Sequence, residues 1–271
     1  MQDYSVYEDI VCTVEGRLLT IMFNRPERRN AMSSRMGREF RDIIGKLYSD
    51  NDIGAVILTG AGDRGFCAGL DIKEADGRAS DESAAPRSAM HDYAGPKELM
   101  DVIINVPQPM VCALNGDAAG MGASIALCCD IIVANDTARL SDPHIKNLAV
   151  VAGDGGTIHW PLMMSMYKAK EYLLTGDFLA AKDAAAFGMI NYALPYEEMM
   201  PKARDIAQRL ADGPQWAVRW TKVALNRIVK NRMEQTMDLA AALEMITLAS
   251  DDHREAMSAF VERRPAKFTG R

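Results

Sequence analysis

The sequence has little cysteine, few aromatic residues and no excess of positive charge. Its five cysteines stand at irregular spacing without a CxxC pair, which argues against a disulfide framework and against a structural zinc site. Lysine and arginine total 31 against 37 aspartates and glutamates, for a net charge of -6. Nucleic-acid binders use an excess of cations to displace counterions, so we expect no nucleic-acid partner. The four histidines are scattered without metal-ligand spacing, so we also expect no metal.

Long apolar runs are lacking as well. Runs such as 131–134 are far shorter than the ~20 residues that a membrane-spanning helix needs. The first residues lack the basic segment and apolar stretch of a secretion signal. We therefore expect a soluble, cytoplasmic protein with no membrane partner. Methionine, in contrast, is abundant at 18 residues of 271, and this flexible side chain fills gaps in cores and at adaptable binding surfaces.

Short apolar runs alternate with amphipathic segments in the first half of the chain. The runs predict strands over residues 11–15, 18–23, 55–59, 110–114 and 131–134. Helical spacing of apolar residues predicts one helix from residue 33 and another over 98–106. Beyond about residue 161 the pattern is mostly helical. This order indicates an α/β fold, with a core over residues 1–200 and a helical region over 201–271.

Two further segments, one before residue 98 and one near the end of the chain, also give secondary-structure signals. The stretch 73–96 is charged and rich in serine, alanine and glycine without an apolar period, which predicts a loop or a poorly formed helix. Near the end of the chain, Asp252 and Glu255 have the spacing of a capping box and predict the start of the last helix.

Two glycine-containing turns, Gly65–Ile72 and Asn115–Ser124, each follow a predicted strand. Glycine lets the backbone approach a ligand closely, and a helix starting near Met121 would add its positive end. The second turn does not have the GxGxxG spacing of a dinucleotide fold, and the chain has no GK[ST] phosphate loop. Two such turns in one chain instead favour a pair of backbone N–H donors that hold one developing oxyanion.

Five segments, in this order, resemble the enoyl-CoA hydratase/isomerase (crotonase) superfamily: Asn24–Ala31, Phe66–Ile72, Asn115–Gly122, Cys129–Ile132 and Ala259–Arg264. The resemblance implies a spiral of ββα units followed by a helical C-terminal trimerisation region. It implies a homo-oligomer, either a trimer or a dimer of trimers. It also implies an acyl-CoA substrate, with coenzyme A present as part of that substrate rather than as a permanently bound cofactor.

The resemblance also implies which residues form the site. The amides of Leu70 and Met121 would hold the enolate oxygen, with Gly69 and Gly120 permitting the turns. Coenzyme A would lie against a second set of residues, of which the last two come from a neighbouring subunit: Arg28, Arg29, Ala68, Ile72, Phe260 and Arg263.

The sequence departs from the family at the two glutamates that its hydratases use. Ser124 stands at the first position and His144 at the second. Histidine suits proton transfer because its unperturbed pKa, ~6.5, lies near neutrality. A carboxylate such as Asp154, in a Gly-Asp-Gly-Gly turn, could fix the ring tautomer and stabilise the imidazolium. We predict that His144 transfers protons with Asp154 as its partner, and that Ser124 positions water or lines the acyl pocket. Glu244 fits a helix-surface or ion-paired role better than a place in the site.

Three functions remain open on these residues. The first is an enoyl-CoA hydratase (a lyase) or isomerase of fatty acid metabolism, in which His144 and Asp154 transfer protons to and from an enolate. The second is a retro-Claisen hydrolase that cleaves a C–C bond of a β-diketone with the same pair. The third is a crotonase-fold protein that binds acyl-CoA without catalysis, which the loss of both glutamates motivates.

Overall fold

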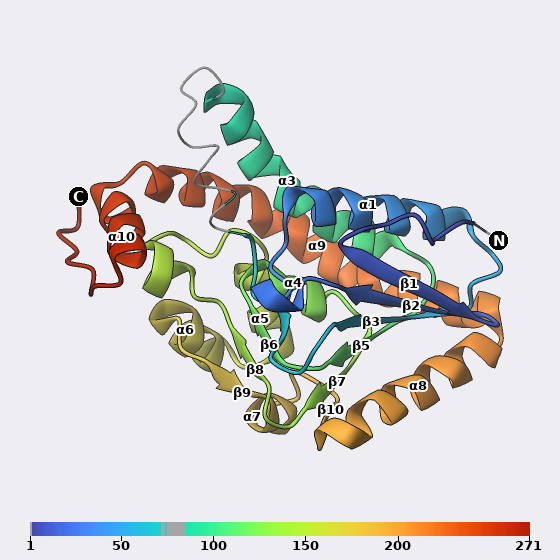
Figure 1. The fold of residues 1–271 in the computed structure, drawn as a ribbon. Coiled ribbons are helices and arrows are strands. Elements are labelled where there is room, and N and C mark those ends of the chain that lie inside the picture. The colour runs from blue at the N-terminus through green and yellow to red at the C-terminus, as the bar shows by residue number, and fades with distance from the viewer. Residues whose placement is uncertain (1, 72–73, 75–84) are drawn as a thin grey trace.

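The computed structural model of the chain describes residues 2–71, 74 and 85–271 (Figure 1). Strands β1 (Ile10–Glu15) and β2 (Leu18–Phe23), both predicted, form an antiparallel hairpin. The remaining strands are β3 (Ala55–Gly60), β4 (Gly65–Cys67), β5 (Met110–Leu114), β6 (Asp117–Ala119), β7 (Ile131–Asn135), β8 (Arg139–Ser141), β9 (Leu179–Ala180) and β10 (Tyr192–Leu194). The helices are α1 (Ser34–Ser49), α3 (Ala85–Asn105), α4 (Met121–Leu127), α5 (Gly156–Met163), α6 (Met166–Thr175), α7 (Ala181–Ala186), α8 (Tyr196–Asp212), α9 (Gln215–Leu248) and α10 (Asp251–Glu262), with the short helical segments η1 (Pro26–Arg28) and η3 (His144–Leu148).

From β3 to β8, successive strands alternate between two sheets. Six strands form the first sheet in the order β1-β2-β3-β5-β7-β10, and four form the second in the order β4-β6-β8-β9. Strands β3, β5 and β7 enter the first sheet, and each is followed along the chain by a strand of the second sheet. Helices α1, α3 and α4 follow the pairs β1–β2, β3–β4 and β5–β6. The chain therefore winds as a spiral of ββα units with a helical C-terminal region, which confirms the predicted fold class.

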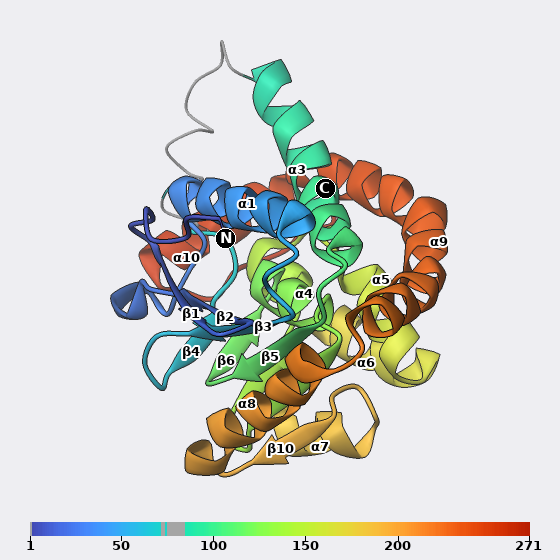
Figure 2. The same cartoon turned by 90° about the vertical axis from the view of Figure 1, so that its right-hand side faces the viewer.

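Helices cover both faces of the first sheet. Helices α1 and α3 lie on one side of it and α8 runs along the other (Figure 1, Figure 2). Val56 and Leu58 of β3 belong to the larger apolar cluster, together with Phe40 of α1. Ile57 belongs instead to the cluster that contains Ile206 of α8. Because alternate residues of a strand point to opposite faces, a strand covered on both sides is buried along its whole length, as β3 is.

Two predictions about helix boundaries are wrong. The helix expected over 98–106 begins at Ala85, so it takes in part of the stretch 73–96. Pro96 lies inside this helix, where proline removes one hydrogen bond without ending the element. The last helix is capped not by a capping box but by Ser250, whose Oγ accepts a hydrogen bond from the His253 amide at 3.1 Å.

The two residues of the expected capping box hold the C-terminal segment instead. Asp252 accepts hydrogen bonds from the amides of Thr269 and Gly270, at 2.7 and 2.9 Å. Glu255 accepts one from the amide of Lys267 at 2.8 Å. In the part of the chain that the structure describes, no helix has both the length and the apolar character needed to cross a membrane.

Candidate active site

Three parallel strands of the second sheet end side by side. Strand β6 pairs in parallel with both β4 and β8. The carboxyl ends of parallel strands meet at one edge of a sheet, which is where α/β proteins place their ligands. Leu70 follows β4, Met121 follows β6 and His144 follows β8. The sheet topology therefore brings the two glycine turns and the candidate histidine to the same edge.

The two glycine turns lie in contact with each other. Gly69 has a φ of 93°, and a Cβ atom built on it would lie 3.0 Å from the Ala119 carbonyl oxygen and 3.8 Å from the Met121 nitrogen. The Leu70 turn is fixed by Met32, whose amide donates to the Gly69 carbonyl at 2.8 Å. Among the described residues, no backbone carbonyl accepts a hydrogen bond from the Leu70 or the Met121 amide. Two neighbouring N–H groups with this freedom can hold one oxygen atom.

His144 lies between carboxylates on both sides of its ring. Its Nδ1 atom is 2.5 Å from Oδ1 of Asp142, and its Nε2 atom is 3.5 Å from Oδ2 of Asp154. A third carboxylate oxygen, Oε1 of Glu244 on α9, is 3.8 Å from Nε2. His144, Asp142 and Asp154 are all buried. A carboxylate on Nδ1 fixes the orientation of the ring and leaves Nε2 to exchange protons with Asp154 or with a substrate.

The buried carboxylates control the protonation of this cluster. Burial alone lowers the pKa of His144, but the negative charges of Asp154, Asp142 and Glu244 outweigh it and raise that pKa to about 10. Burial also raises the pKa of Asp154 to about 6, against the lowering effect of His144. Near pH 7 the pair therefore holds an imidazolium beside an ionised carboxylate. Groups with pKa values displaced in this way are typical of catalytic sites.

The glycines of the Gly-Asp-Gly-Gly turn leave space for side chains that pack around Asp154. A Cβ atom on Gly153 would lie 2.2 Å from Glu244 Oε2, and one on Gly156 would lie 1.9 Å from Asp142 Oδ2. A Cβ atom on Gly155, whose φ is 113°, would lie 2.5 Å from the Met100 methyl group. Each glycine thus leaves room for a different side chain around Asp154, and a larger residue would displace that side chain.

Ser124 is brought to the same place. It is buried on α4, one turn after Met121, and a Cβ atom on Gly155 would lie 3.1 Å from its Oγ. Ser124 therefore lies beside the turn that bears Asp154. Its hydroxyl can donate or accept a hydrogen bond but cannot act as a carboxylate base.

Sequence reasoning missed two residues of this cluster. Asp142 lies two positions before His144, and a carboxylate that close in sequence is a usable signal for a ring partner. Glu244 has no such local signal, because α9 brings it to the site from a distant part of the chain. Of the two roles expected for Glu244, the helix-surface one is wrong and the ion-paired one is confirmed, because its side chain is 17% exposed and its Oε1 atom lies 3.8 Å from Nε2 of His144.

The candidate coenzyme A residues are distributed more widely. Arg28 and Arg29 are exposed at the end of η1, and the Arg29 carbonyl accepts a hydrogen bond from the Ala68 amide at 3.1 Å. The arginine loop is thereby joined to the first glycine turn. Phe260 and Arg263 are exposed at the end of α10, and within the described part of the chain no hydrogen bond or ion pair joins them to His144. Ile72 lies outside the described residues.

A metal could be considered at the same cluster. Asp142, His144 and Asp154 offer ligand atoms that all lie within 4.8 Å of one another. The two nitrogens of one imidazole ring point away from each other, however, and here each faces a different carboxylate. One cation cannot replace both contacts, so the arrangement fits proton transfer better than metal binding.

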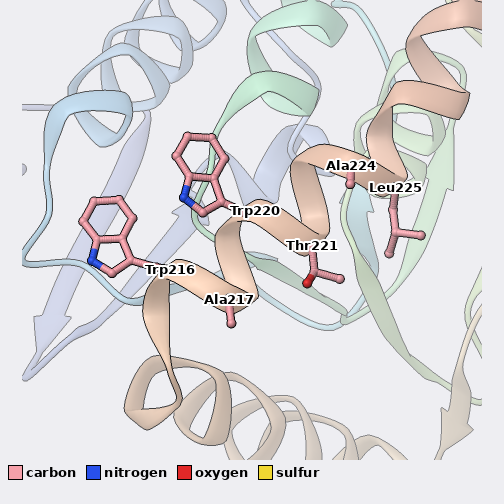
Figure 3. Close-up of a pocket in the computed structure, with 6 residues that line it drawn as sticks. All are labelled: Trp216, Ala217, Trp220, Thr221, Ala224 and Leu225. Atoms are coloured by element: carbon pink, nitrogen blue, oxygen red, sulfur yellow. The ribbon is translucent and has the colours of Figure 1, made fainter.

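Two cavities elsewhere in the described part of the chain contain none of the predicted site residues. One, of about 600 Å³, lies along α9 beside Trp216 and Trp220 (Figure 3). The other, also about 600 Å³, is lined in part by Cys128 and His159. Cys128 Sγ is 3.3 Å from His159 Nε2, and burial lowers the pKa of His159 to about 4. His159 is therefore neutral and packed in the interior.

The chain is similar to known proteins over nearly its whole length. The chain matches the family described as Enoyl-CoA hydratase/isomerase over residues 13–271. It is 33% identical over 264 residues to the putative enoyl-CoA hydratase/isomerase YngF of Bacillus subtilis, covering 97% of this chain and 99% of that protein. It is 31% identical over 262 residues to the crotonyl-CoA hydratase of Syntrophomonas wolfei, covering 97% and 98%. A crystal structure of an enoyl-CoA hydratase/isomerase from Mycobacterium paratuberculosis, 29% identical, superposes with a TM-score of 0.83 over 92% of this chain and 97% of that one.

Proposed function

Because the chain belongs to the enoyl-CoA hydratase/isomerase (crotonase) family, we propose that it is a hydratase or isomerase acting on an acyl-CoA thioester. The observation that carries the proposal is the place of His144. This buried histidine contacts Asp142 and Asp154 at the sheet edge where the Leu70 and Met121 amides also lie. Oxygen-binding donors and a proton-transfer pair are the two parts that enolate chemistry needs.

The proposed roles follow from charge. The Leu70 and Met121 amides hold the thioester oxygen, which becomes negatively charged as the enolate forms. In hydration, the Asp154 carboxylate takes a proton from water while the oxygen of that water bonds to the β-carbon. The His144 imidazolium then gives its proton to the α-carbon. Transfer of the proton from Asp154 to His144, across the 3.5 Å that separate them, restores the starting state.

Asp142 and Ser124 support this pair. Asp142 accepts the Nδ1 proton of His144 and so keeps Nε2 directed at Asp154. Ser124 and His144 stand where the hydratases of the family use glutamates, and we propose that the Ser124 hydroxyl positions the water. We propose that coenzyme A itself lies along the Arg28–Ala68 side of the site, with Phe260 and Arg263 of a second subunit completing it.

A retro-Claisen hydrolysis of a β-diketone is the second candidate. It is favoured by one observation: the acid–base pair is a histidine and an aspartate, beside a serine rather than a second glutamate. Water would add to one carbonyl, with its proton going to Asp154. The C–C bond would then break to leave an enolate at the two amides, and His144 would protonate that enolate.

Substrate turnover distinguishes the two reactions. Purified protein is mixed with crotonyl-CoA and, separately, with a cyclic β-diketone, and the loss of ultraviolet absorbance of each is followed. Thioester turnover that His144→Ala abolishes supports the first proposal, whereas diketone cleavage alone contradicts it. Asp154→Asn should lower the thioester turnover as well, and Asp205→Asn, an exposed change on α8, is its matched control. Coenzyme A binding without turnover of either substrate would favour a non-catalytic protein.

We also propose that residues 201–271 form the oligomerisation region of a trimer or a dimer of trimers. Support comes from α9, which leaves large apolar side chains exposed: Trp216, Trp220, Leu225, Ile228 and Ile246. Apolar side chains gathered on one helix mark an interaction surface more often than free solvent. Light scattering coupled to size-exclusion chromatography measures the mass directly, and a monomer of 29.8 kDa would contradict the proposal.

A further inference from the structure

The segment that connects His144 to Asp154 is held by the corner between α9 and α10. Thr247, near the end of α9, accepts a hydrogen bond through Oγ1 from the Val151 amide at 3.1 Å. His253, in the first turn of α10, has Nδ1 at 2.7 Å from the Leu148 carbonyl oxygen. A carbonyl oxygen only accepts hydrogen bonds, so Nδ1 of His253 is the donor.

Both anchors are themselves fixed within the corner. The Thr247 hydroxyl donates to the Glu244 carbonyl of its own helix at 2.8 Å and is thus oriented toward Val151. The His253 amide donates to the Ser250 side chain at 3.1 Å, which ties His253 to the start of α10. The contacts from the corner therefore come from ordered helical residues rather than from mobile side chains.

The second half of the connecting segment, residues 149–152, belongs to no strand or helix, whereas η3 covers residues 144–148. Ala149 ends η3 in the left-handed region with a φ of 53°, and residues 150–152 precede the glycine turn that carries Asp154. No strand or helix ladder fixes this part of the described chain. Its path nevertheless sets the separation of His144 and Asp154, because these two residues stand at its ends.

We propose that Thr247 and His253 are positioning residues for the His144–Asp154 pair, acting through the main chain of residues 148–151. The inference rests on the proposed function of that pair. Within the described part of the chain, neither Thr247 nor His253 contacts the His144 ring or the Asp154 carboxylate. Each therefore acts by setting the distance between His144 and Asp154. A displacement of about 1 Å in a catalytic pair can cost about 100-fold in rate.

Conservative and disruptive substitutions of the same residue test the idea. Thr247→Val keeps the shape of the side chain and removes the hydroxyl, whereas Thr247→Ser keeps the hydroxyl. His253→Leu removes the donor, whereas His253→Asn places an amide N–H close to the position of Nδ1. We expect Thr247→Val and His253→Leu to lower kcat by about 10- to 100-fold with KM changed less than about twofold. We expect Thr247→Ser and His253→Asn to stay within about threefold of the unchanged protein.

Thr221→Val is the control, because Thr221 lies exposed on the same helix and lines the surface cavity instead of the loop (Figure 3). It should leave kcat unchanged. Equal losses of kcat in Thr221→Val and Thr247→Val would overturn the proposal, as would an unchanged kcat in both Thr247→Val and His253→Leu.

A spectroscopic readout separates this inference from the proposed function. The ring ¹⁵N signals of His144, assigned by their loss in His144→Gln, report its environment without any turnover. We expect these signals to shift in Thr247→Val and His253→Leu and to be unchanged in Thr221→Val. Unshifted signals would contradict the positioning role even if His144 proves catalytic. Turnover that survives His144→Ala would instead contradict the proposed function, while shifted signals would still support the positioning role.

Discussion

The Nδ1 atom of His144 lies 2.5 Å from Oδ1 of Asp142, and this contact decides which ring nitrogen faces Asp154. Once the imidazolium has given up its Nε2 proton, the neutral ring carries one N–H, and Asp142 holds it at Nδ1. Asp142→Asn places an amide there, which can also donate and so can stabilise the wrong tautomer. We expect kcat to fall on the order of 10²- to 10⁴-fold, with thioester binding little changed. Steady-state kinetics measure this, and a loss confined to KM would contradict the orienting role of Asp142.

Gly156 leaves the space that Asp142 occupies. Gly156→Ala would place a Cβ atom 1.9 Å from Asp142 Oδ2, so the carboxylate must move away from His144. We expect a loss of about 1–3 kcal/mol in the free energy of unfolding, typical of overpacking, together with a lower kcat. Gly45→Ala is the matched control, because nothing lies within 4 Å of a Cβ atom on this exposed residue of α1. Urea denaturation should show Gly45→Ala as stable as the unchanged protein or more so.

A plot of kcat/KM against pH should have two limbs. The pKa of Asp154 is raised to about 6 by burial, and the pKa of His144 is raised to about 10 by the surrounding carboxylates, which outweigh the effect of burial. If Asp154 acts ionised and His144 acts protonated, kcat/KM rises as the pH passes about 6 and falls as it passes about 10. Asp154→Asn should remove the limb near pH 6 from its residual activity. A single limb centred near pH 6.5, the value of an unperturbed histidine, would contradict this assignment.

The free energy of unfolding should also depend on pH, because His144 is protonated to a different extent in the folded and the unfolded protein. The folded-state pKa of His144 is raised above its unfolded value of 6.5, so the folded protein binds this proton more tightly. The stability that this proton contributes is fully present below about pH 6.5 and is lost as the pH rises through about 10. We expect His144→Gln to reduce the difference in the free energy of unfolding between pH 6.5 and 10. Denaturation curves at both values measure it, and an unreduced difference would show that other groups cause it.

The exposed indoles on α9 give a test of assembly. In the single chain, the rings of Trp216 and Trp220 are stacked with their centroids 6.4 Å apart. Trp216 is 64% exposed and Trp220 is 61% exposed, whereas Trp160 is buried. If α9 lies at a subunit interface, acrylamide should quench tryptophan fluorescence weakly in the assembled protein. Trp220→Glu should increase the quenching and lower the mass measured by light scattering. Strong quenching in an assembled protein would place these indoles outside the interface.

Much of the fold could be predicted from local patterns. The apolar runs in 10–23 and 55–60, and the helical spacing after Ser33, are set by side chains that are buried in the interior. The α3 start was missed because residues 85–96 show no apolar period and contain Pro96. A pattern of apolar residues indicates burial, and a helix without that pattern gives no such signal.

The candidate site was predicted in part, for a physical reason. His144 could be proposed because it stands where the resembled family's hydratases use a glutamate, and Asp154 because it lies in a Gly-Asp-Gly-Gly turn ten residues later. The direction of the His144 ring depends on the Asp142 side chain, and Glu244 reaches the site only because α9 folds back across the loop. Contacts between residues so far apart in the chain depend on tertiary packing, which local sequence does not specify.

The central claim is that His144 moves a proton at the α-carbon of an acyl-CoA held by the Leu70 and Met121 amides. The most direct test is exchange of the α-protons of butyryl-CoA in D₂O, followed by mass spectrometry, because it needs enolate formation but no complete reaction. We expect the protein to incorporate deuterium and His144→Ala to do so at least about 100-fold more slowly. Exchange no faster than in buffer, or an equal rate in His144→Ala, would contradict the account.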